Sequence, residues 1–333
     1  MDTVLGIPNL KGQTVVVGSA GGSFGDAIKK TVVAPFEEAT GAKVVYSDTI
    51  CASFDKLVKA RQFASDVDMC NDYGPMLAQS DAGLLKSDPR LVQIAKARGL
   101  QADWYQSDLI ANNFYAEALA WNTAKYGNDH PSSWAEFFDT SKFKGPRGLH
   151  TSATGDLEIA LLASGTTPSS LYPLDVDKAF DVLDALRKNA TVHFWRNGAD
   201  SVNQLSTGEI GYTWTFSNRV ASGVKQGLPL DMTFKQALLV GSGAAVSATA
   251  KNVDGAIAFI DFYMAPSIQA ALTNESGVGP AYPAAAKLVD PSMQKYVPTT
   301  PENLSQVIPL NNDYWRKNYN ALQDRYTKWQ SGS

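Results

Sequence analysis

The feature that most constrains the fold is a regular alternation of short apolar strands and helical stretches in the first hundred residues. Thr14–Gly18 is a β-branched apolar run, as expected for a buried parallel strand. A glycine-rich loop follows, and a helical stretch then runs from about residue 25 to residue 39. Val44–Tyr46 and Val67–Cys70 repeat the strand signal, with a second helix beginning at Ser53. The alternation predicts an α/β fold with a doubly wound sheet and right-handed crossovers.

A second α/β set is predicted after the extended, alanine-rich segment Ala116–Asn122. Pro35 predicts a division in the first helix, and Thr40-Gly41 predicts its end. Ser133 is expected to cap a short helix and Asp177 a longer one. The other expected elements are strands at 148–151, 210–214, 237–240 and 244–246, and helices at 155–164, 253–264 (strongly amphipathic) and 314–329.

Length and charge limit the classes of protein to which this chain can belong. Its 333 residues are enough for two α/β domains, each with its own core. The chain has a formal charge of −4 and its sequence shows no basic stripe, so we expect no nucleic-acid partner. The longest apolar runs are strand-sized, which predicts no transmembrane helix. The first residues lack a signal-peptide pattern, which fits either a cytoplasmic protein or a chain whose leader has been replaced.

Two cysteines, Cys51 and Cys70, follow predicted strands in adjacent βα units. They are either two unrelated thiols or one disulfide between neighbouring loops, which needs Cα atoms within about 7 Å. A single pair does not decide the redox compartment, and both interpretations stay open.

Motifs of common enzyme classes are missing from the sequence. The three histidines, His130, His150 and His193, have no metal-ligand spacing, and there is no Gly-x-Ser-x-Gly motif. The loop Gly18–Gly25 is neither a Walker loop nor Gly-x-Gly-x-x-Gly. We therefore expect no enzyme activity, no metal and no cofactor.

The glycine-rich loop has two compatible interpretations. Its residues Gly21, Gly22 and Ser23 open a helix, and free backbone N–H groups there favour a carboxylate or phosphate. The alternative is a tight turn that needs a positive φ at Gly21 or Gly22.

Aromatic residues gather at the predicted strand ends, where ligands bind in open α/β sheets. Each could also be an ordinary core residue, but aromatic faces beside a few polar groups suit a small amphipathic or cationic ligand. The aromatic candidates are Tyr73, Trp195, Trp214, Phe216 and Tyr282, with polar Asn71 and Asn218 nearby. Arg196, followed by Asn197 and Asp200, would clamp a carboxylate if it is buried; the alternative is a solvated surface arginine.

Four segments in order resemble the spermidine/putrescine-type solute-binding proteins of ABC importers. Each is weak alone, but their order and spacing over about residues 14–288 make the set specific. The segments are Phe36–Val44, Ser133–Phe138 with Phe143-Lys144-Gly145, Gly208–Trp214 and Ala248–Ala256.

This resemblance implies a two-lobed periplasmic-binding-protein fold with two hinge crossings and a ligand between the lobes. The first lobe is expected at 12–118 and 243–287, and the second at 119–242 and 288–333. Ligand contacts with both lobes would shift the population toward the closed form. Tyr73 and Trp214 match aromatic ligand contacts of the polyamine binders, and Asn71 matches a polar one.

The departures from the polyamine binders indicate a different ligand. Their acidic ligand contacts correspond to uncharged Ser152, Gly155 and Ser242, and a dication would then lack counter-charges. Asp48, Asp156 or Asp200 could substitute. A ligand with one anionic end fits better, such as a γ-amino acid or an opine-like conjugate. Its carboxylate would bind the glycine loop or Arg196.

We therefore expect a monomeric periplasmic protein that captures a small polar organic molecule by lobe closure. It would deliver this ligand to the membrane permease subunits of an ABC importer. The alternatives are a polyamine-binding protein, an α/β cleft enzyme such as a transferase, and a sensor subunit.

Overall fold

The computed structural model describes residues 2–332, which divide into two compact units. The first comprises Met1–Phe114 and Val240–Pro301, and the second Tyr115–Leu239 and Glu302–Ser333. The chain passes between them within two strands, β4 (Ile110–Asn122) and β8 (Leu230–Val246), and again after Pro301. The expected boundaries lie in the same two strands, a few residues further along each.

The expected lobe boundary near residue 288 differs from the structure. Residues 288–301 were expected in the second lobe, but the structure groups them with the first unit. Val289 and Val297 pack on Ala270, which belongs to a helix of the first unit, and this apolar contact explains the assignment.

The sheet of the first unit is mainly parallel. β1 (Thr14–Ser19) lies between β2 (Lys43–Ser47) and β3 (Val67–Met69) and is parallel to both. The C-terminal half of β8 adds an antiparallel strand beside β3, with Val67 opposite Val246. The carboxyl ends of β1, β2 and β3 therefore share one edge, where the first predicted loops lie.

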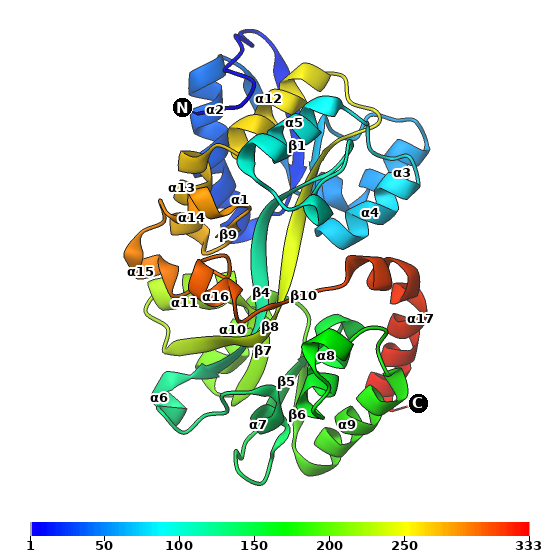
Figure 1. Ribbon diagram of the computed structural model, residues 1–333, viewed down its shortest axis with the longest axis vertical. Coiled ribbons are helices and arrows are strands. Elements are labelled where there is room, and N and C mark those ends of the chain that lie inside the picture. Colours follow the sequence, from blue (N-terminus) through cyan, green and yellow to red (C-terminus); the bar gives the residue numbers. More distant parts are fainter. Residues whose placement is uncertain (1, 333) are drawn as a thin grey trace. The chain divides into compact units, whose positions relative to one another are not determined.

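Helices cover both faces of this sheet, and Figure 1 shows α3 and α4 on one side of β1 and α1 and α13 on the other. The main core joins β1 and β3 to the helices that include α1, α2 and α12, with Phe36 edge-on to Phe259 and Phe262. The helices and short strand of this unit are α1 (Gly22–Ile28), α2 (Ala34–Thr40), α3 (Phe54–Lys59), α4 (Tyr73–Asp81), α5 (Pro89–Arg98), α12 (Val253–Tyr263), α13 (Pro266–Ser276), α14 (Pro283–Ala286), α15 (Pro291–Gln294) and β9 (Gly279–Pro280).

The predicted first helix is divided as Pro35 indicated. A π-helical segment, Lys29–Val33, separates α1 from α2, and Pro35 lies in the first turn of α2. The predicted end is also confirmed, because Gly41 caps α2 with φ +73°.

The amphipathic assignment of residues 253–264 is wrong. All side chains from Ala256 to Tyr263 are buried, because α12 packs on β1 and β3 as well as on α5 and α13. A helix that is apolar on every side is a core helix.

The strands of the second unit follow the order β8-β4-β7-β5-β6, and β10 pairs with β8 at Leu238 and Leu239. β7 (Tyr212–Phe216) is antiparallel to β4, and β5 (Arg147–His150) is parallel to β7 and to β6 (Val192–Trp195). The carboxyl ends of β5, β6 and β7 therefore lie at one edge. The other elements are α6 (Thr123–Tyr126), α7 (Trp134–Phe138), α8 (Ala153–Ala163), α9 (Val176–Asn189), α10 (Gly198–Thr207), α11 (Ser217–Lys225), α16 (Pro301–Leu304, at the boundary), β10 (Ile308–Pro309) and α17 (Asn312–Ser331).

The helix caps of the second unit confirm one prediction and correct another. Ser133 caps α7 by accepting a hydrogen bond from the backbone N–H of Glu136. Asp175, not Asp177, caps α9, since its carboxylate accepts from the N–H of Lys178. Asp177 lies in the first turn and pairs with Arg325 of α17 at 2.8 Å.

A buried arginine explains the local order after α7. The guanidinium of Arg147 donates to the carbonyl oxygens of Phe137, Phe143 and Gly145 and stacks on the ring of Tyr212. These bonds satisfy one carbonyl group in α7 and two in the loop that leads from α7 to β5.

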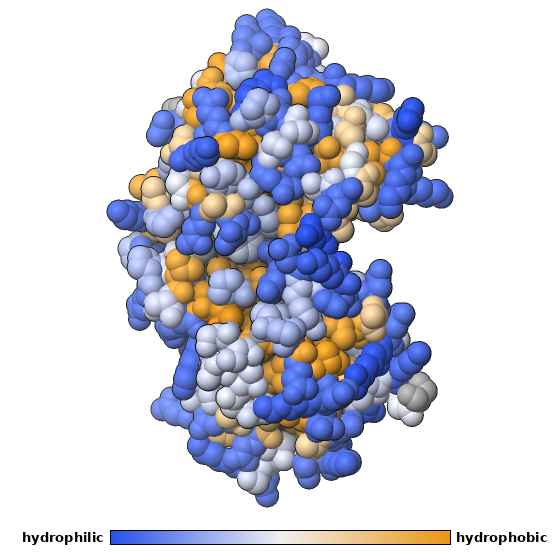
Figure 2. Space-filling view, turned by 45° about the vertical axis from the view of Figure 1, so that its right-hand side comes forward, coloured by the Kyte–Doolittle hydropathy of each residue, from blue (hydrophilic) through white to orange (hydrophobic). Residues whose placement is uncertain are grey.

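Within residues 2–332, no single helix has the length and apolar character to span a membrane. α12 and α13 taken together are long and apolar enough, but the pair is bent by 68°. Figure 2 shows polar side chains over most of the viewed surface of each unit, with smaller apolar patches among them.

Candidate functional site

The two cysteines form a disulfide at the strand edge of the first unit. Their Cα atoms lie 5.2 Å apart, and the bond joins the loop after β2 to the end of β3. The Cys51 sulfur also lies 3.4 Å from the carbonyl oxygen of Ser19, the last residue of β1. The interpretation as two unrelated thiols is wrong, and the disulfide fixes two loops of this edge.

The glycine loop is a tight turn with an acidic neighbour. Gly21 caps α1, and Gly22 has φ +62°. A Cβ at Gly21 would lie 2.3 Å from a carboxylate oxygen of Asp48, so this acid lies directly against the loop. Its negative charge disfavours an anion there. Ser23 is exposed in the first turn of α1.

Three predicted residues of the first unit lie together at the end of β3. Asn71 is exposed, and its carbonyl oxygen accepts from the N–H of Gly243. The Ser242 hydroxyl donates a hydrogen bond of 3.3 Å to Asp72, the residue that lies between Asn71 and Tyr73 in the sequence. Tyr73 is only 2% exposed and packs edge-on against Trp104. Tyr73 therefore supports the wall of this edge.

Tyr282 does not join this group. It is 2% exposed, belongs to the main core, and donates its hydroxyl proton to the carbonyl oxygen of Met264. Of the two interpretations, core packing describes its place in the structure.

The second unit brings three of the predicted aromatic residues together. Trp195 and Trp214 are fully buried and pack edge-on with ring centroids 4.7 Å apart. Phe216 packs on both and is partly exposed. The cluster therefore has a rigid indole floor and a phenyl ring that reaches the surface.

His150, at the end of β5, belongs to this cluster although its sequence context gave no signal. Its ring stacks on Trp195 with centroids 4.2 Å apart. Burial lowers the pKa of His150 to about 4, so the ring is neutral at pH 7.

Asp156 lies beneath the cluster and is fully buried. It accepts hydrogen bonds from the indole nitrogen of Trp214 at 2.5 Å and from the N–H of His150 at 3.0 Å. Tyr326 of α17 also contacts its carboxyl group. Burial raises the pKa of Asp156 to about 8. This acid holds protein groups and does not serve as a free counter-charge.

Glu117 is a second acid beside the cluster and was not among the residues predicted from the sequence. It is 5% exposed, lies on β4 and is paired in register with Phe216. A Cβ at Gly155 would lie 2.5 Å from its carboxylate and 2.9 Å from the Trp214 ring. One charged residue within the apolar segment Ala116–Trp121 was the available signal.

Arginines of the second unit divide between surface and interior. Arg196 is exposed, so the structure supports the surface interpretation for its side chain. The carboxylate of Asp200 accepts hydrogen bonds from the backbone N–H of Arg196 and from the side-chain amide of Asn197, which caps α10. Arg219, which was not predicted, is partly buried. Its side chain and the Phe216 ring both lie next to Gly198. Burial lowers the pKa of Arg219.

The remaining predicted residues lie close in sequence to this cluster. Ser152 caps α8 by accepting from the N–H of Thr154, and it is partly exposed in the loop after His150. Asn218 is largely buried in the first turn of α11, directly after Phe216 and Ser217.

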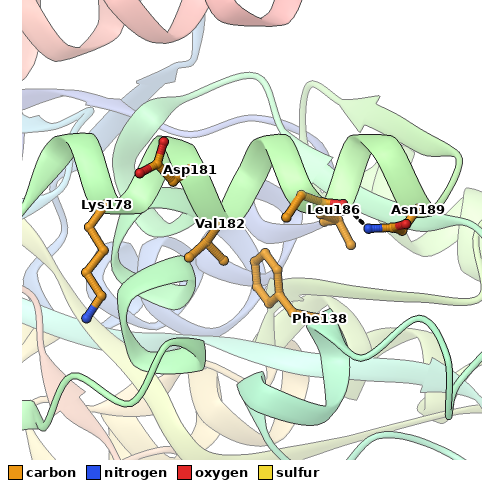
Figure 3. Close-up of a pocket in the computed structure, with 7 residues that line it drawn as sticks. Phe138, Lys178, Asp181, Val182, Leu186 and Asn189 are labelled. Atoms are coloured by element: carbon orange, nitrogen blue, oxygen red, sulfur yellow. Dashed lines mark hydrogen bonds between the residues drawn. The ribbon is translucent and has the colours of Figure 1, made fainter.

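A separate groove on the second unit contains none of the predicted residues. It has a volume of about 290 Å³, and Figure 3 shows Phe138 of α7 facing the α9 side chains along it. Its lining comprises Phe138, Lys178, Asp181, Val182, Ala185, Leu186 and Asn189. Apolar carbon dominates this lining, and we assign no ligand to it.

No group of three or more His, Cys, Asp or Glu side chains could hold a metal ion in the part of the chain that the structure describes. The titratable cluster at the aromatic floor is instead internally hydrogen-bonded.

Comparisons with known proteins agree with this architecture. A family model for bacterial extracellular solute-binding proteins matches residues 31–299. The γ-aminobutyric acid-binding protein of Pseudomonas aeruginosa is 27% identical over 95% of this chain and 91% of its own. The spermidine/putrescine-binding periplasmic protein of Escherichia coli is 22% identical over 88% of this chain and 85% of its own.

A solved structure extends the likeness to three dimensions. The binding protein AgtB from A. tumefaciens R10, in complex with agropinic acid, superposes with a TM-score of 0.80. It is 30% identical, and the match covers 96% of this chain and 98% of that one. The two-lobed periplasmic-binding-protein fold expected from the sequence is confirmed. This chain belongs to the bacterial extracellular solute-binding proteins.

Proposed function

We propose that this protein captures a small zwitterionic amino acid of the γ-aminobutyrate type, or an opine-like conjugate, in the periplasm. It then presents the ligand to the permease subunits of an ABC importer, as a monomer and without chemical turnover. Lobe closure follows because a ligand with contacts on both lobes favours the closed form.

One observation carries the ligand class: the aromatic cluster of the second unit has side chains of opposite charge beside it. Arg219 and Phe216 both lie against Gly198, since a Cβ there would be 2.7 Å from the arginine Cγ and 2.9 Å from the phenyl ring. Glu117 is opposite Phe216 in the sheet register. A guanidinium suits a carboxylate, and a carboxylate suits an ammonium group. A zwitterion matches both charges.

The relatives support this ligand class. One is named for γ-aminobutyric acid, and another was solved with agropinic acid. Both cover nearly the whole chain, so the similarity includes the segments that carry Glu117, Trp214 and Arg219.

A polyamine fits this arrangement less well, although a relative carries that name. Glu117 suits one ammonium group, but the positive charge of Arg219 repels a second one. Ser152 and Ser242 are uncharged and add no counter-charge.

A thermal-shift screen tests the proposal. The protein is unfolded and refolded to remove carried-over ligand, and then screened against γ-aminobutyrate, other amino acids, opines, putrescine and spermidine. A ligand at about a thousand times its Kd adds roughly 4 kcal/mol, which raises Tm by about 8–16 °C. We expect this shift for a zwitterion or opine. A shift with polyamines alone contradicts the ligand class.

A mass-spectrometric check separates binding from catalysis. The hit compound is incubated with the protein and recovered. Recovery of the unchanged compound agrees with transport, whereas more moles of product than of protein would support the enzyme alternative.

A further inference from the structure

The loop between β5 and α8 receives its support from the C-terminal helix. The side-chain amide of Gln323 donates to the carbonyl oxygen of Thr151 at 3.0 Å and accepts from the N–H of Ala153 at 2.9 Å. Gln330 donates to the carbonyl oxygen of His150 at 3.0 Å. These bonds link residues 150–153 to α17, about 170 positions later in the chain. The sheet contact ends at Thr151, whose N–H donates to the carbonyl oxygen of Trp195. α17 satisfies the backbone groups beside it, namely the carbonyl oxygens of His150 and Thr151 and the N–H of Ala153.

Asp156 joins the same helix to the aromatic floor. One oxygen accepts from the Trp214 indole, and the other accepts from the His150 N–H and contacts the hydroxyl group of Tyr326. One buried carboxyl group therefore connects β5, β7 and α17. Such a network is costly to leave partly unsatisfied, so its members hold one another in place.

The network around Asp156 is complete only when the carboxyl group of Asp156 carries a proton. Tyr326 has one hydroxyl proton but two neighbouring acceptors, Asp156 and the carbonyl oxygen of His150 at 3.1 Å. If Asp156 is protonated, it donates to Tyr326, and Tyr326 then donates to His150. Both contacts become hydrogen bonds at once. Burial, with a smaller contribution from Glu158, favours this neutral form. The positive charge of Arg187 lowers the pKa of the Tyr326 hydroxyl and so opposes the larger effect of burial, which raises it.

We propose that Gln323, Tyr326 and Asp156 are positioning residues, which hold the loop 150–153 and the Trp214 indole in the arrangement that binds ligand. This inference rests on the proposed function in one respect, namely that the aromatic cluster of the second unit contacts the ligand. The clamp itself is a property of the ligand-free protein and can be measured there.

The first experiment uses the ligand-free protein. Gln323→Ala removes both loop bonds, and Asn320→Ala, on the exposed side of the same helix, is the matched control. Loss of about one or two hydrogen bonds should raise the exchange rate of the Ala153 amide by roughly five- to a hundredfold. The control should leave it unchanged. Equal exchange in the wild type and Gln323→Ala would overturn the proposal.

Asp156 is tested by a conservative and a disruptive variant. Asp156→Asn resembles the neutral acid, because its amide oxygen can accept from Trp214 and its NH₂ group can donate to Tyr326. Asp156→Ala removes both contacts. In a ¹⁵N–¹H spectrum, with Trp214→Phe to assign the signal, Asp156→Ala should move the Trp214 indole resonance and Asp156→Asn should largely restore it. A resonance that is insensitive to both variants would count against the role of Asp156.

A ligand titration completes the test, with γ-aminobutyrate as the probe. Gln323→Ala should weaken binding by about tenfold, and Asn320→Ala by less than about twofold. A loosened loop with unchanged affinity would show that the clamp does not serve binding and would overturn the proposal. If the wild type does not bind γ-aminobutyrate, the proposed ligand fails. The exchange and indole measurements still decide whether the clamp exists.

Discussion

The indole nitrogen of Trp214 donates a hydrogen bond of 2.5 Å to a carboxyl oxygen of the fully buried Asp156. The aromatic residue that the sequence predicted at the ligand site is therefore held from behind by an acid. Burial raises the pKa of this acid to about 8. This relationship links the ligand site to the pH dependence of stability.

Stability should fall as pH rises from about 6.5 to 8. Burial raises the pKa of Asp156 to about 8, that of Asp68 to about 7, and that of Glu158. Each folded carboxyl group then binds more protons than its unfolded form, so raising the pH destabilises the fold by up to about 1.4 kcal/mol per pH unit and group. His150 has the opposite sign, but its effect ends near pH 6.5 because its pKa is lowered to about 4.

The check is a series of thermal unfolding curves between about pH 6.5 and 8 for the wild type and Asp156→Asn. The variant has one fewer raised carboxyl group, so its Tm should fall less steeply. Parallel curves for the two proteins would show that Asp156 does not titrate in this range.

Arg219 rather than Arg196 should hold the ligand carboxylate. Arg219 is partly buried beside Phe216, whereas the side chain of Arg196 is exposed. Loss of charged hydrogen bonds in Arg219→Leu should weaken γ-aminobutyrate binding by roughly 10- to 100-fold, measured by calorimetry. Arg196→Leu is the control and should change the affinity by less than about twofold. The reverse order of effects would place the carboxylate at Arg196.

Gly155→Ala should disturb the site more than Gly165→Ala. Both positions have a positive φ, +87° and +90°, so both variants carry backbone strain of about 1 kcal/mol or more. Only at Gly155 would the new Cβ meet Glu117 and Trp214, whereas Gly165 has nothing within 4 Å. Tm and ligand affinity should therefore both fall further for Gly155→Ala. Equal effects would mean that the contacts at Gly155 adapt without cost.

Reduction of the Cys51–Cys70 disulfide should destabilise the first unit. The cysteines are 19 positions apart, and closing a loop of this size stabilises by about 3 kcal/mol. Reductant should lower the Tm by about 6–12 °C. A double variant, Cys51→Ser with Cys70→Ser, should have the lower Tm from the start and show no response to reductant. A wild-type Tm that ignores complete reduction contradicts this prediction.

The sequence predicted those parts of the fold whose local pattern has one physical meaning. Runs such as Thr14–Gly18 are apolar and β-branched, so they indicated buried strands. Gly41 ended its helix because a positive φ suits glycine. α12 was described wrongly, because the neighbours that cover its second side come from distant segments.

The candidate site was less predictable, because burial and pairing depend on contacts far apart in the chain. Arg196 and Arg219 are the same residue type, and only the fold shows that the second is partly buried. The cysteine spacing did not decide between thiols and a disulfide. Glu117 was visible as a charge in an apolar segment, yet its position against Gly155 required the structure.

The most direct test of the central claim is a calorimetric titration of the refolded protein with γ-aminobutyrate, opines, putrescine and spermidine. We expect one zwitterion or opine to bind with a stoichiometry of one and a Kd of about a micromolar or below, and both polyamines to bind at least about a hundredfold more weakly. Submicromolar binding of putrescine or spermidine, with no binding of amino acids or opines, would contradict the proposed ligand class.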